Sequence, residues 1–232
     1  MRDILELRQK FEGKRIFAIG NGPSLNSTQL DLIQGEYSIA MNRISLIYNQ
    51  TLWRPNFFVC STTNVKRYDW RSDIQKTMDL GIKSFIWDQI GEFLDCHENT
   101  YLLNCEYGSE VRDDPPIDWW SNDLAKRVTK FGTSMLVALQ ICNYLGFQEV
   151  YLLGCDLAFK KYKDGDKDLN HFSSEYGTPG LDYENLNRNM MAAHKLALKA
   201  SSLTEMTIYN ATPSGALEIY PRVSLTDVFA NV

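Results

Sequence analysis

The feature that most constrains the fold is the alternation of short apolar runs with longer segments of helical period. Seven runs rich in Ile, Val, Phe and Tyr have the length of strands, at 15–20, 37–42, 56–61, 83–88, 100–104, 149–156 and 206–212. Between several of them lie helix candidates, at 27–33, 65–79, 134–145 and 183–202. Such alternation is typical of an α/β domain with a mostly parallel sheet flanked by helices. The length of 232 residues fits one domain over 1–232.

The clearest unit of this alternation is "GTSMLVALQICNYLGFQEVYLLGCD", residues 132–156. Thr133 and Ser134 open a helix with a broad apolar surface, and Gly146 suits a left-handed cap at its end. An apolar strand follows directly. A helix this apolar is expected to pack against a sheet.

Candidate binding residues follow the predicted strands, because ligands of open α/β sheets bind beyond the carboxyl ends of the strands. They are Gly20, Asn21, Gly22 and Ser24 after the first run, Asn42 after the second, Ser61 after the third, and Gly154 and Asp156 after the sixth. Asp156 stands where a carboxylate binds a ribose or sugar hydroxyl. A turn-forming aspartate is the alternative.

The glycine-rich stretch "RIFAIGNGPSLN", residues 15–26, has the shape of a phosphate loop. Its two glycines allow a tight turn and a close approach to a ligand, and the N–H groups of a following helix attract an anion. The loop lacks the lysine of a Walker loop and the third glycine of a dinucleotide fingerprint. Thr133 and Ser134 form a second candidate anion site at a helix start. An ordinary turn and ordinary helix capping are the alternatives at these two places.

Residues 158–182 form a polar, glycine-containing segment that is too long for a simple connection, and we expect a lid there. Of the three histidines, His97 is expected to be solvated and His194, within a helix, to be structural, which leaves His171 in the lid as the candidate general base. Five lid residues have the spacing of a calcium-binding hand, but Leu169 occupies the position that requires glycine. These five are Asp164, Asp166, Asp168, Asn170 and Glu175.

Composition excludes several classes of function. The net charge is −5 and the sequence has no dense block of Lys and Arg, so nucleic acid is not an expected partner. The N-terminus lacks the apolar core of a signal peptide, and no stretch approaches the ~20 apolar residues of a membrane span. We therefore expect a cytoplasmic protein with at most peripheral membrane association. The five cysteines show no C-x-x-C spacing, which argues against a zinc site or a disulfide framework.

The ordered motifs "IGNGPSL", "MNR", "TS" before an apolar helix, "LGFQEVYLLGCDLAF" and a histidine-bearing loop resemble the bacterial sialyltransferases of glycosyltransferase family 42. They also resemble the wider superfamily that includes motility-accessory-factor glycosyltransferases and 6-hydroxymethylpterin diphosphokinases. The resemblance runs from about Lys14 to the lid and continues less specifically to the C-terminus. It implies a single Rossmann-like domain with a lid over about 158–182.

The resemblance also implies a function. The expected enzyme transfers a sugar from a CMP-sialic acid-like donor, or another nucleotide sugar, to a glycan acceptor in surface polysaccharide or lipooligosaccharide synthesis. It uses no metal and no cofactor. Homo-oligomers are common among the sialyltransferases, which makes self-association one expectation for this chain.

The resemblance assigns the nucleotide to Gly20, Asn21, Gly22, Ser24, Asn42, Gly154 and Asp156 and to Thr133 and Ser134, and the catalytic base to His171. The family's asparagine after the third strand falls here near Ser61 or Asn64. The family's tyrosine after the Gly-x-Asp step aligns with Ala158. Two tyrosines in the family steady the departing phosphate; here Phe159 has no hydroxyl, whereas Tyr162 and Tyr176 do. Tyr162 is thus the second expected catalytic residue.

Two other functions stay open at this point. One is a diphosphokinase that transfers diphosphate from ATP to a pterin alcohol, a reaction that needs magnesium and closely placed carboxylates. The third strand ends in "CSTTN", without an aspartate, which weighs against it. The other is a non-catalytic nucleotide-binding subunit of a larger assembly.

Overall fold

The computed structural model describes residues 3–67, 69–108, 113–163, 166–177 and 182–230. Its centre is a seven-stranded sheet in the order β5-β4-β3-β2-β1-β8-β9, and every pairing in that sheet is parallel. The strands are β1 (Arg15–Ile19), β2 (Ser38–Met41), β3 (Phe57–Cys60), β4 (Lys83–Trp87), β5 (Thr100–Leu103), β8 (Glu149–Leu153) and β9 (Thr207–Asn210). The seven predicted strands and the α/β fold are confirmed.

The strand order reverses at β1. From β1 the chain adds β2, β3, β4 and β5 on one side, and then crosses to add β8 and β9 on the other side. The loops that leave β1 and β8 therefore turn to opposite faces and open a crevice between them, which is where open α/β sheets bind ligands. The register of β1 with β8 ends at Ile19 and Leu153, so residues from Gly20 and from Gly154 begin at the same edge.

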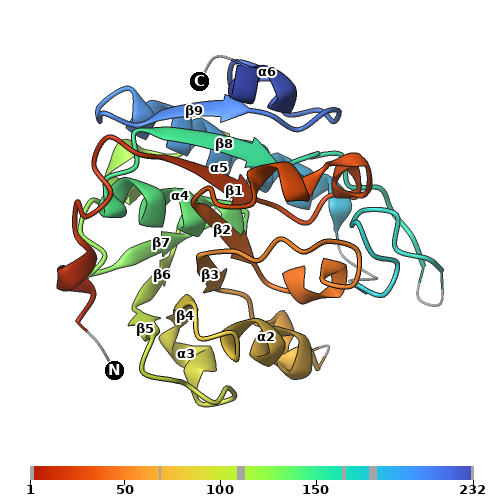
Figure 1. The fold of residues 1–232 in the computed structure, drawn as a ribbon, viewed down its shortest axis with the longest axis horizontal. Helices are drawn as coiled ribbons and strands as arrows, with labels where there is room; N and C mark the ends of the chain where they lie inside the picture. The colour runs from red at the N-terminus through yellow and green to blue at the C-terminus, as the bar shows by residue number, and fades with distance from the viewer. Residues whose placement is uncertain (1–2, 68, 109–112, 164–165, 178–181, 231–232) are drawn as a thin grey trace.

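Helices cover the sheet on both sides (Figure 1). The α4 helix (Ser134–Leu145) packs on β1, β2 and β3, and α5 (Tyr183–Ser201) packs beside α4 and against β9. The α2 helix (Arg71–Met78) contacts β3, and α3 (Asp88–Gly91) contacts β4 and β5. The α6 helix (Leu225–Ala230) stacks Phe229 on Phe17 of β1, with ring centroids 5.9 Å apart.

The α4 helix begins and ends where the sequence predicts. The Thr133 side chain accepts a hydrogen bond from the Met135 N–H, and Gly146 ends the helix at φ 93°. Ten of its twelve residues are buried, because one side packs on the sheet and the other faces α5 and β7.

One predicted helix is wrong and another is interrupted. Segment 27–33 contains no α-helix but the last residue of one 3₁₀ helix, η2 (Pro23–Ser27), and all of a second, η3 (Leu30–Ile33). The hydroxyls of Ser27 and Thr28 donate hydrogen bonds to the Ser24 carbonyl. Short polar side chains that bond the nearby backbone in this way compete with α-helix formation. Segment 65–79 is two helices, α1 (Asn64–Arg67) and α2, because Asp69 adopts a positive φ of 53° between them.

A second, two-stranded parallel sheet was not predicted. It pairs β6 (Cys105–Tyr107) with β7 (Val128–Lys130), each only three residues long. The buried Gln140 of α4 holds β7 in place, since its amide bonds the N–H and the C=O of Thr129 at 3.1 and 2.8 Å. The remaining 3₁₀ helices are η1 (Ile4–Leu7), η4 (Ile44–Ile47) and η5 (Ile117–Trp119).

The predicted lid lies between β8 and α5, and 158–163 and 166–177 form no helix or strand. Figure 1 shows this segment, in teal, beyond the carboxyl ends of the strands. Residues 164–165 and 178–181 of the predicted lid lie outside the described residues. Within the described part of the chain, none of the helices combines the length and apolar character that crossing a membrane requires.

Candidate active site

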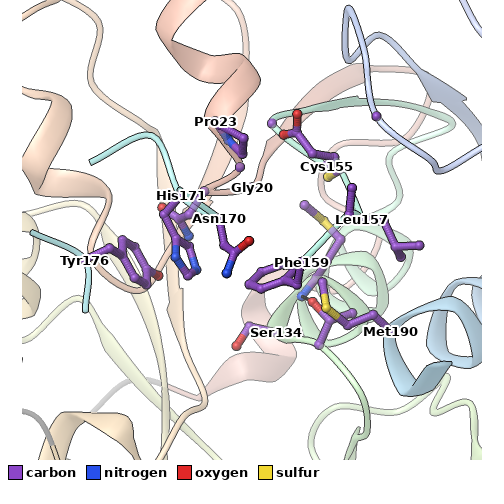
Figure 2. A pocket seen from close by; sticks show the side chains of 18 of the residues that line it. Gly20, Pro23, Ser134, Cys155, Leu157, Phe159, Asn170, His171, Tyr176 and Met190 are labelled. Atoms are coloured by element: carbon purple, nitrogen blue, oxygen red, sulfur yellow. Dashed lines mark hydrogen bonds between the residues drawn. The ribbon is translucent and has the colours of Figure 1, made fainter. Parts of the chain in front are cut away.

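A cavity of about 390 Å³ lies at the carboxyl ends of β1 and β8, where the strand order reverses. Its walls come from the loops after β1, β2 and β8, the start of α4, the lid and one side of α5. Figure 2 shows the His171 and Tyr176 rings on one side, and Leu157 and Met190 on the opposite side. The cavity brings together most of the predicted site residues: Gly20, Asn21, Gly22, Asn42, Thr133, Ser134, Gly154, Asp156 and His171.

Three predicted site residues do not line this cavity: Ser24, Ser61 and Tyr162. Each is connected to a cavity residue by hydrogen bonds. Ser24 bonds Asp156, and Ser61 bonds Ser134. Tyr162 donates a hydrogen bond to Asp168, and Asp168 in turn bonds His171.

The two glycines of the first loop are required by packing between loops. A Cβ at Gly20 would lie 2.4 Å from the Gly154 carbonyl oxygen, and a Cβ at Gly22 would lie 1.8 Å from Asp156 Oδ2. The Gly22 N–H bonds the Gly154 carbonyl at 2.9 Å. The loops after β1 and β8 therefore touch backbone to backbone, and this contact forms the floor of the crevice.

Asp156 fastens the first loop from the opposite side of the crevice. Its carboxylate accepts from the Ser24 hydroxyl at 2.8 Å and from the Ser24 N–H at 3.3 Å. Burial raises the pKa of this carboxyl, and the hydrogen bonds from Ser24 oppose that rise. The structure thus adds a loop-holding contact to a residue predicted to bind a ribose or sugar hydroxyl.

Asn21 and Asn42 bring unpaired acceptors to the cavity. The Asn21 amide donates to the Met41 carbonyl at 3.1 Å, and the Asn42 amide donates to Ser134 Oγ at 3.4 Å. The Oδ1 atom of each is buried without a partner among the described residues. A buried acceptor without a partner is costly, which marks these two asparagines as unusual among the cavity residues.

Ser134 is poised to donate into the cavity. Its Oγ accepts from Asn42 and from the Ser61 hydroxyl, at 3.4 and 3.2 Å. Because both neighbours donate to it, the hydroxyl proton of Ser134 is left for a ligand. Ser134 is also the first residue of α4, and the partial positive charge at the N-terminus of this helix favours an anion.

The lid histidine is part of a buried pair that sequence inspection missed. His171 Nδ1 lies 2.7 Å from Asp168 Oδ2, and the two side chains are only 8% and 1% exposed. Burial alone would raise the pKa of the Asp168 carboxyl, but the His171 hydrogen bond and charge, with donors from Asn170 and Tyr162, hold that pKa below its usual value. An ionised Asp168 orients the ring so that Nε2 is the nitrogen available to the cavity. The spacing Asp-x-x-His was the available signal.

Tyr176 supports the other side of the His171 ring. The two rings stack with centroids 3.8 Å apart and an interplanar angle of 7°, and Phe159 meets the His171 ring edge-on at 5.2 Å. Burial raises the pKa of Tyr176 well above its ordinary value, and hydrogen bonds from Arg43 and Asn42 only partly oppose it. Tyr176 therefore carries a protonated hydroxyl in the cavity wall, whereas Tyr162 packs against Tyr183 outside it.

The lid is fastened to the sheet by Arg43. One Arg43 nitrogen donates to the carbonyls of Glu175 and Tyr176, at 2.5 and 2.6 Å. The other two bond the Asp73 carboxylate of α2, at 2.7 and 2.6 Å. The guanidinium also lies over the rings of Trp70 and Tyr176. Sequence inspection noted Arg43 only as part of a motif, because its partners are far away in the chain.

His194 lies on the cavity instead of being only a structural helix residue. It is 3% exposed and forms part of the cavity wall on α5, together with Met190 one turn earlier. Burial lowers its pKa to about 4. A lone histidine within a helix gives no sequence signal for such a position.

Two of the lid residues with the spacing of a calcium-binding hand, Asp168 and Asn170, form hydrogen bonds within the lid. Asp168 bonds His171 and the Asn170 N–H, while Asn170 holds the N–H and C=O of Lys160 at 2.6 and 2.7 Å. Asp164 lies outside the described residues. Within the described ranges, no three His, Cys, Asp or Glu side chains gather as a metal site would require.

The fold and the crevice define a Rossmann-like α/β domain with a lid over the carboxyl edge of its sheet. No protein-family model matches the sequence, and no curated protein matches it. Among solved structures, the MAf glycosyltransferase from Magnetospirillum magneticum AMB-1 has a similar fold, with a TM-score of 0.52 and 11% sequence identity. The similarity covers 99% of this chain and 40% of that protein, so this chain spans two fifths of its length.

Proposed function

We propose that this protein is a glycosyltransferase that uses a nucleotide-activated sugar, with a CMP-sialic acid-like donor as the first candidate. The observation that carries the proposal is His171 in the wall of a cavity that the loop after β1 also lines, with the His171 ring paired to the buried Asp168 carboxylate behind it. The fold shared with a glycosyltransferase supports it. The expected pathway is surface polysaccharide or lipooligosaccharide synthesis.

In the proposed reaction, His171 Nε2 takes the proton of an acceptor hydroxyl while that oxygen attacks the anomeric carbon of the donor sugar. The bond between the anomeric carbon and the phosphate oxygen breaks, and the nucleotide leaves with both bonding electrons. The proton resides on the imidazole, where Asp168 stabilises the resulting positive charge. Proton removal by a positioned base typically accelerates such a step by about 10²–10⁴-fold.

The departing phosphate needs donors. The Ser134 hydroxyl and the N-terminus of α4 supply them on one side, and Lys160 from the lid also lines the cavity. Preorganised donors of this kind stabilise charge as it develops on the leaving group. The unpaired Oδ1 atoms of Asn21 and Asn42 suit hydroxyl or amino groups of the nucleotide sugar.

The test measures nucleotide release from a panel of CMP-, UDP- and GDP-sugars, with plausible glycan acceptors, at high enzyme concentration, with EDTA and with added magnesium. We expect release from one donor class and its loss in His171→Ala. His97→Ala is the matched control, because His97 bonds Asp79 outside the cavity walls.

Two outcomes would contradict the proposal. No release from any donor, combined with magnesium-dependent AMP formation from ATP and a pterin alcohol, would establish the diphosphokinase instead. Nucleotide binding that His171→Ala leaves unchanged, with no turnover of any substrate, would indicate a non-catalytic subunit.

A further inference from the structure

The cavity contains a second histidine whose surroundings differ from those of His171. His194 lies on α5, and only 3% of its surface is exposed. It faces the cavity along the same side of the helix as Met190, four residues earlier. Met135 of α4 and Leu157, in the loop after β8, line the cavity as well, so its walls are partly apolar.

The neighbouring Tyr220 fixes the position of the His194 proton. The Tyr220 hydroxyl lies 2.9 Å from the His194 carbonyl oxygen and 3.1 Å from His194 Nδ1. A carbonyl oxygen can only accept, so the single hydroxyl proton is donated there. The hydroxyl oxygen must then accept from Nδ1–H. A neutral imidazole carries one N–H, which leaves Nε2 with a bare lone pair.

The ring also stays neutral at physiological pH. Burial lowers the pKa of His194 to about 4, and no charged neighbour offsets it. The titratable group in contact with His194 is Tyr220, which interacts electrostatically with Cys155. Burial raises the pKa of both groups, so neither carries charge near neutrality. Nε2 is therefore a neutral acceptor and remains one across the physiological range.

The two histidines are thus opposites. His171 presents Nδ1 to a carboxylate, which stabilises the protonated ring and suits a base that gains a proton. His194 presents Nδ1 to a hydroxyl, in a site where protonation is disfavoured. A group that does not change its charge is suited to binding.

We propose that His194 Nε2 is a fixed hydrogen-bond acceptor in the cavity wall and binds an uncharged donor, a hydroxyl or amino group, of the ligand. An anionic oxygen has no proton to give to Nε2, so this part of the cavity excludes phosphate and carboxylate and receives a nucleoside or sugar group. The choice of ligand rests on the proposed function; the proton position on His194 does not.

The first experiment determines the tautomer without any ligand. Long-range ¹H–¹⁵N spectra of histidine-labelled protein are recorded from pH 5.5 to 8, with His194 assigned by its absence in His194→Asn. We expect the Nδ1–H form, unchanged over this range, and a shift toward the Nε2–H form in Tyr220→Phe. Tyr209→Phe, which alters a tyrosine stacked on Tyr151 away from His194, is the control. An Nε2–H tautomer, or protonation of His194 within this range, would overturn the proposal.

The second experiment measures binding of CMP and of CMP-N-acetylneuraminic acid by calorimetry. His194→Asn keeps an N–H at the place of Nδ1 but removes the acceptor at Nε2, whereas His194→Gln keeps an acceptor near Nε2. We expect His194→Asn to weaken binding about tenfold, which corresponds to about 1.4 kcal/mol, and His194→Gln to weaken it less. Melting temperatures of both variants show whether the fold is retained.

The two ligands distinguish the sources of the donor group. Weaker binding of both ligands by His194→Asn assigns the contact to the nucleoside, and weaker binding of the nucleotide sugar alone assigns it to the sugar. Unchanged binding of both overturns the proposal. If neither ligand binds the wild-type protein, the CMP donor and the ligand assigned to His194 both fail, while the spectra still decide the tautomer.

Discussion

At the scale of single residues, function depends on which partner each side chain meets in the folded protein. The Asp168–His171 pair and the approach of Gly22 to Asp156 are two examples. In the first, a buried carboxylate fixes the orientation of an imidazole. In the second, the absence of a side chain lets two loops touch. Each makes a prediction that a single substitution tests.

Asp168→Asn is expected to lower kcat about 100-fold, the lower end of the range for a positioned base, with the affinity for the nucleotide sugar changed less than about threefold. The amide cannot stabilise the protonated His171 ring as the carboxylate does. The measurement is the steady-state rate of nucleotide release. Asp166→Asn is the control, because Asp166 is exposed and its side chain bonds only the Lys163 N–H among the described residues. Wild-type turnover in Asp168→Asn would contradict the role given to Asp168.

Gly22→Ala is expected to lower the free energy of unfolding by about 1–3 kcal/mol, the usual cost of overpacking. The added Cβ would overlap Asp156 Oδ2, at 1.8 Å, and force the two loops apart. Urea unfolding measures this change. Gly91→Ala is the control, since its Cβ would meet only the flexible Leu102 side chain, at 3.0 Å. Equal effects of the two substitutions would show that the loops have room to separate.

At the scale of elements, the lid is held by hydrogen bonds to three residues of the rest of the protein, Asn21, Asn187 and Arg43. The Phe172 N–H bonds the Asn21 carbonyl at 3.0 Å, and Asn187 of α5 bonds both backbone groups of Phe159, at 3.0 and 2.8 Å. Arg43 donates hydrogen bonds to the carbonyls of Glu175 and Tyr176. Because these partners lie in the loops after β1 and β2 and on α5, the lid position depends on several elements at this edge of the sheet.

Arg43→Gln is expected to increase hydrogen exchange in 170–177 at least about tenfold, because the bonds to Glu175 and Tyr176 and to Asp73 are lost together. Exchange measured by mass spectrometry, segment by segment, tests this. Arg54→Gln is the matched control: Arg54 also bonds backbone carbonyls and lies over a tyrosine ring, but at Tyr48, away from the lid. Unchanged exchange in the lid would show that the bonds to Asn21 and Asn187 suffice to order it.

At the scale of the whole molecule, stability depends on pH through groups whose pKa differs between the folded and unfolded states. His194 has a folded pKa of about 4, and about 6.5 is expected in the unfolded chain. Between these values the unfolded state binds a proton that the folded state does not, so the contribution of His194 is lost as pH falls. The raised pKa of Asp156 has the opposite effect at lower pH. The effect of His194 is therefore isolated by comparison with a variant.

The wild-type protein is expected to lose about 2 kcal/mol more unfolding free energy than His194→Asn between pH 7.5 and pH 5. The asparagine variant has no group at this position that binds a proton. Urea unfolding at the two pH values gives the difference directly. Parallel pH dependence in the two proteins would mean that His194 becomes protonated inside the folded state, contrary to its burial.

Much of the fold and part of the candidate site follow from local sequence. The apolar runs place all seven strands of the central sheet, and Thr133 and Gly146 bound α4 correctly. Most strand-end residues reach the cavity, because parallel strands bring their carboxyl ends to one edge. The predictions that failed also have local causes. At 27–33, hydroxyl side chains bond the backbone, and 3₁₀ turns form where an α-helix was predicted. The strands of the second sheet are too short to show a hydrophobic period.

The sequence by itself thus determined the α/β class, the strands and the set of residues at their ends, because hydrophobic period and helix caps depend on neighbours in the chain. Tertiary structure decided the partners: Asp168 beside His171, Arg43 under the lid, Asp156 against the first loop, and Tyr220 beside His194. Those last three pairs join segments 26 to 133 residues apart. Burial, tautomer and charge depend on such contacts, which form only when the sheet brings segments distant in the sequence together at one edge.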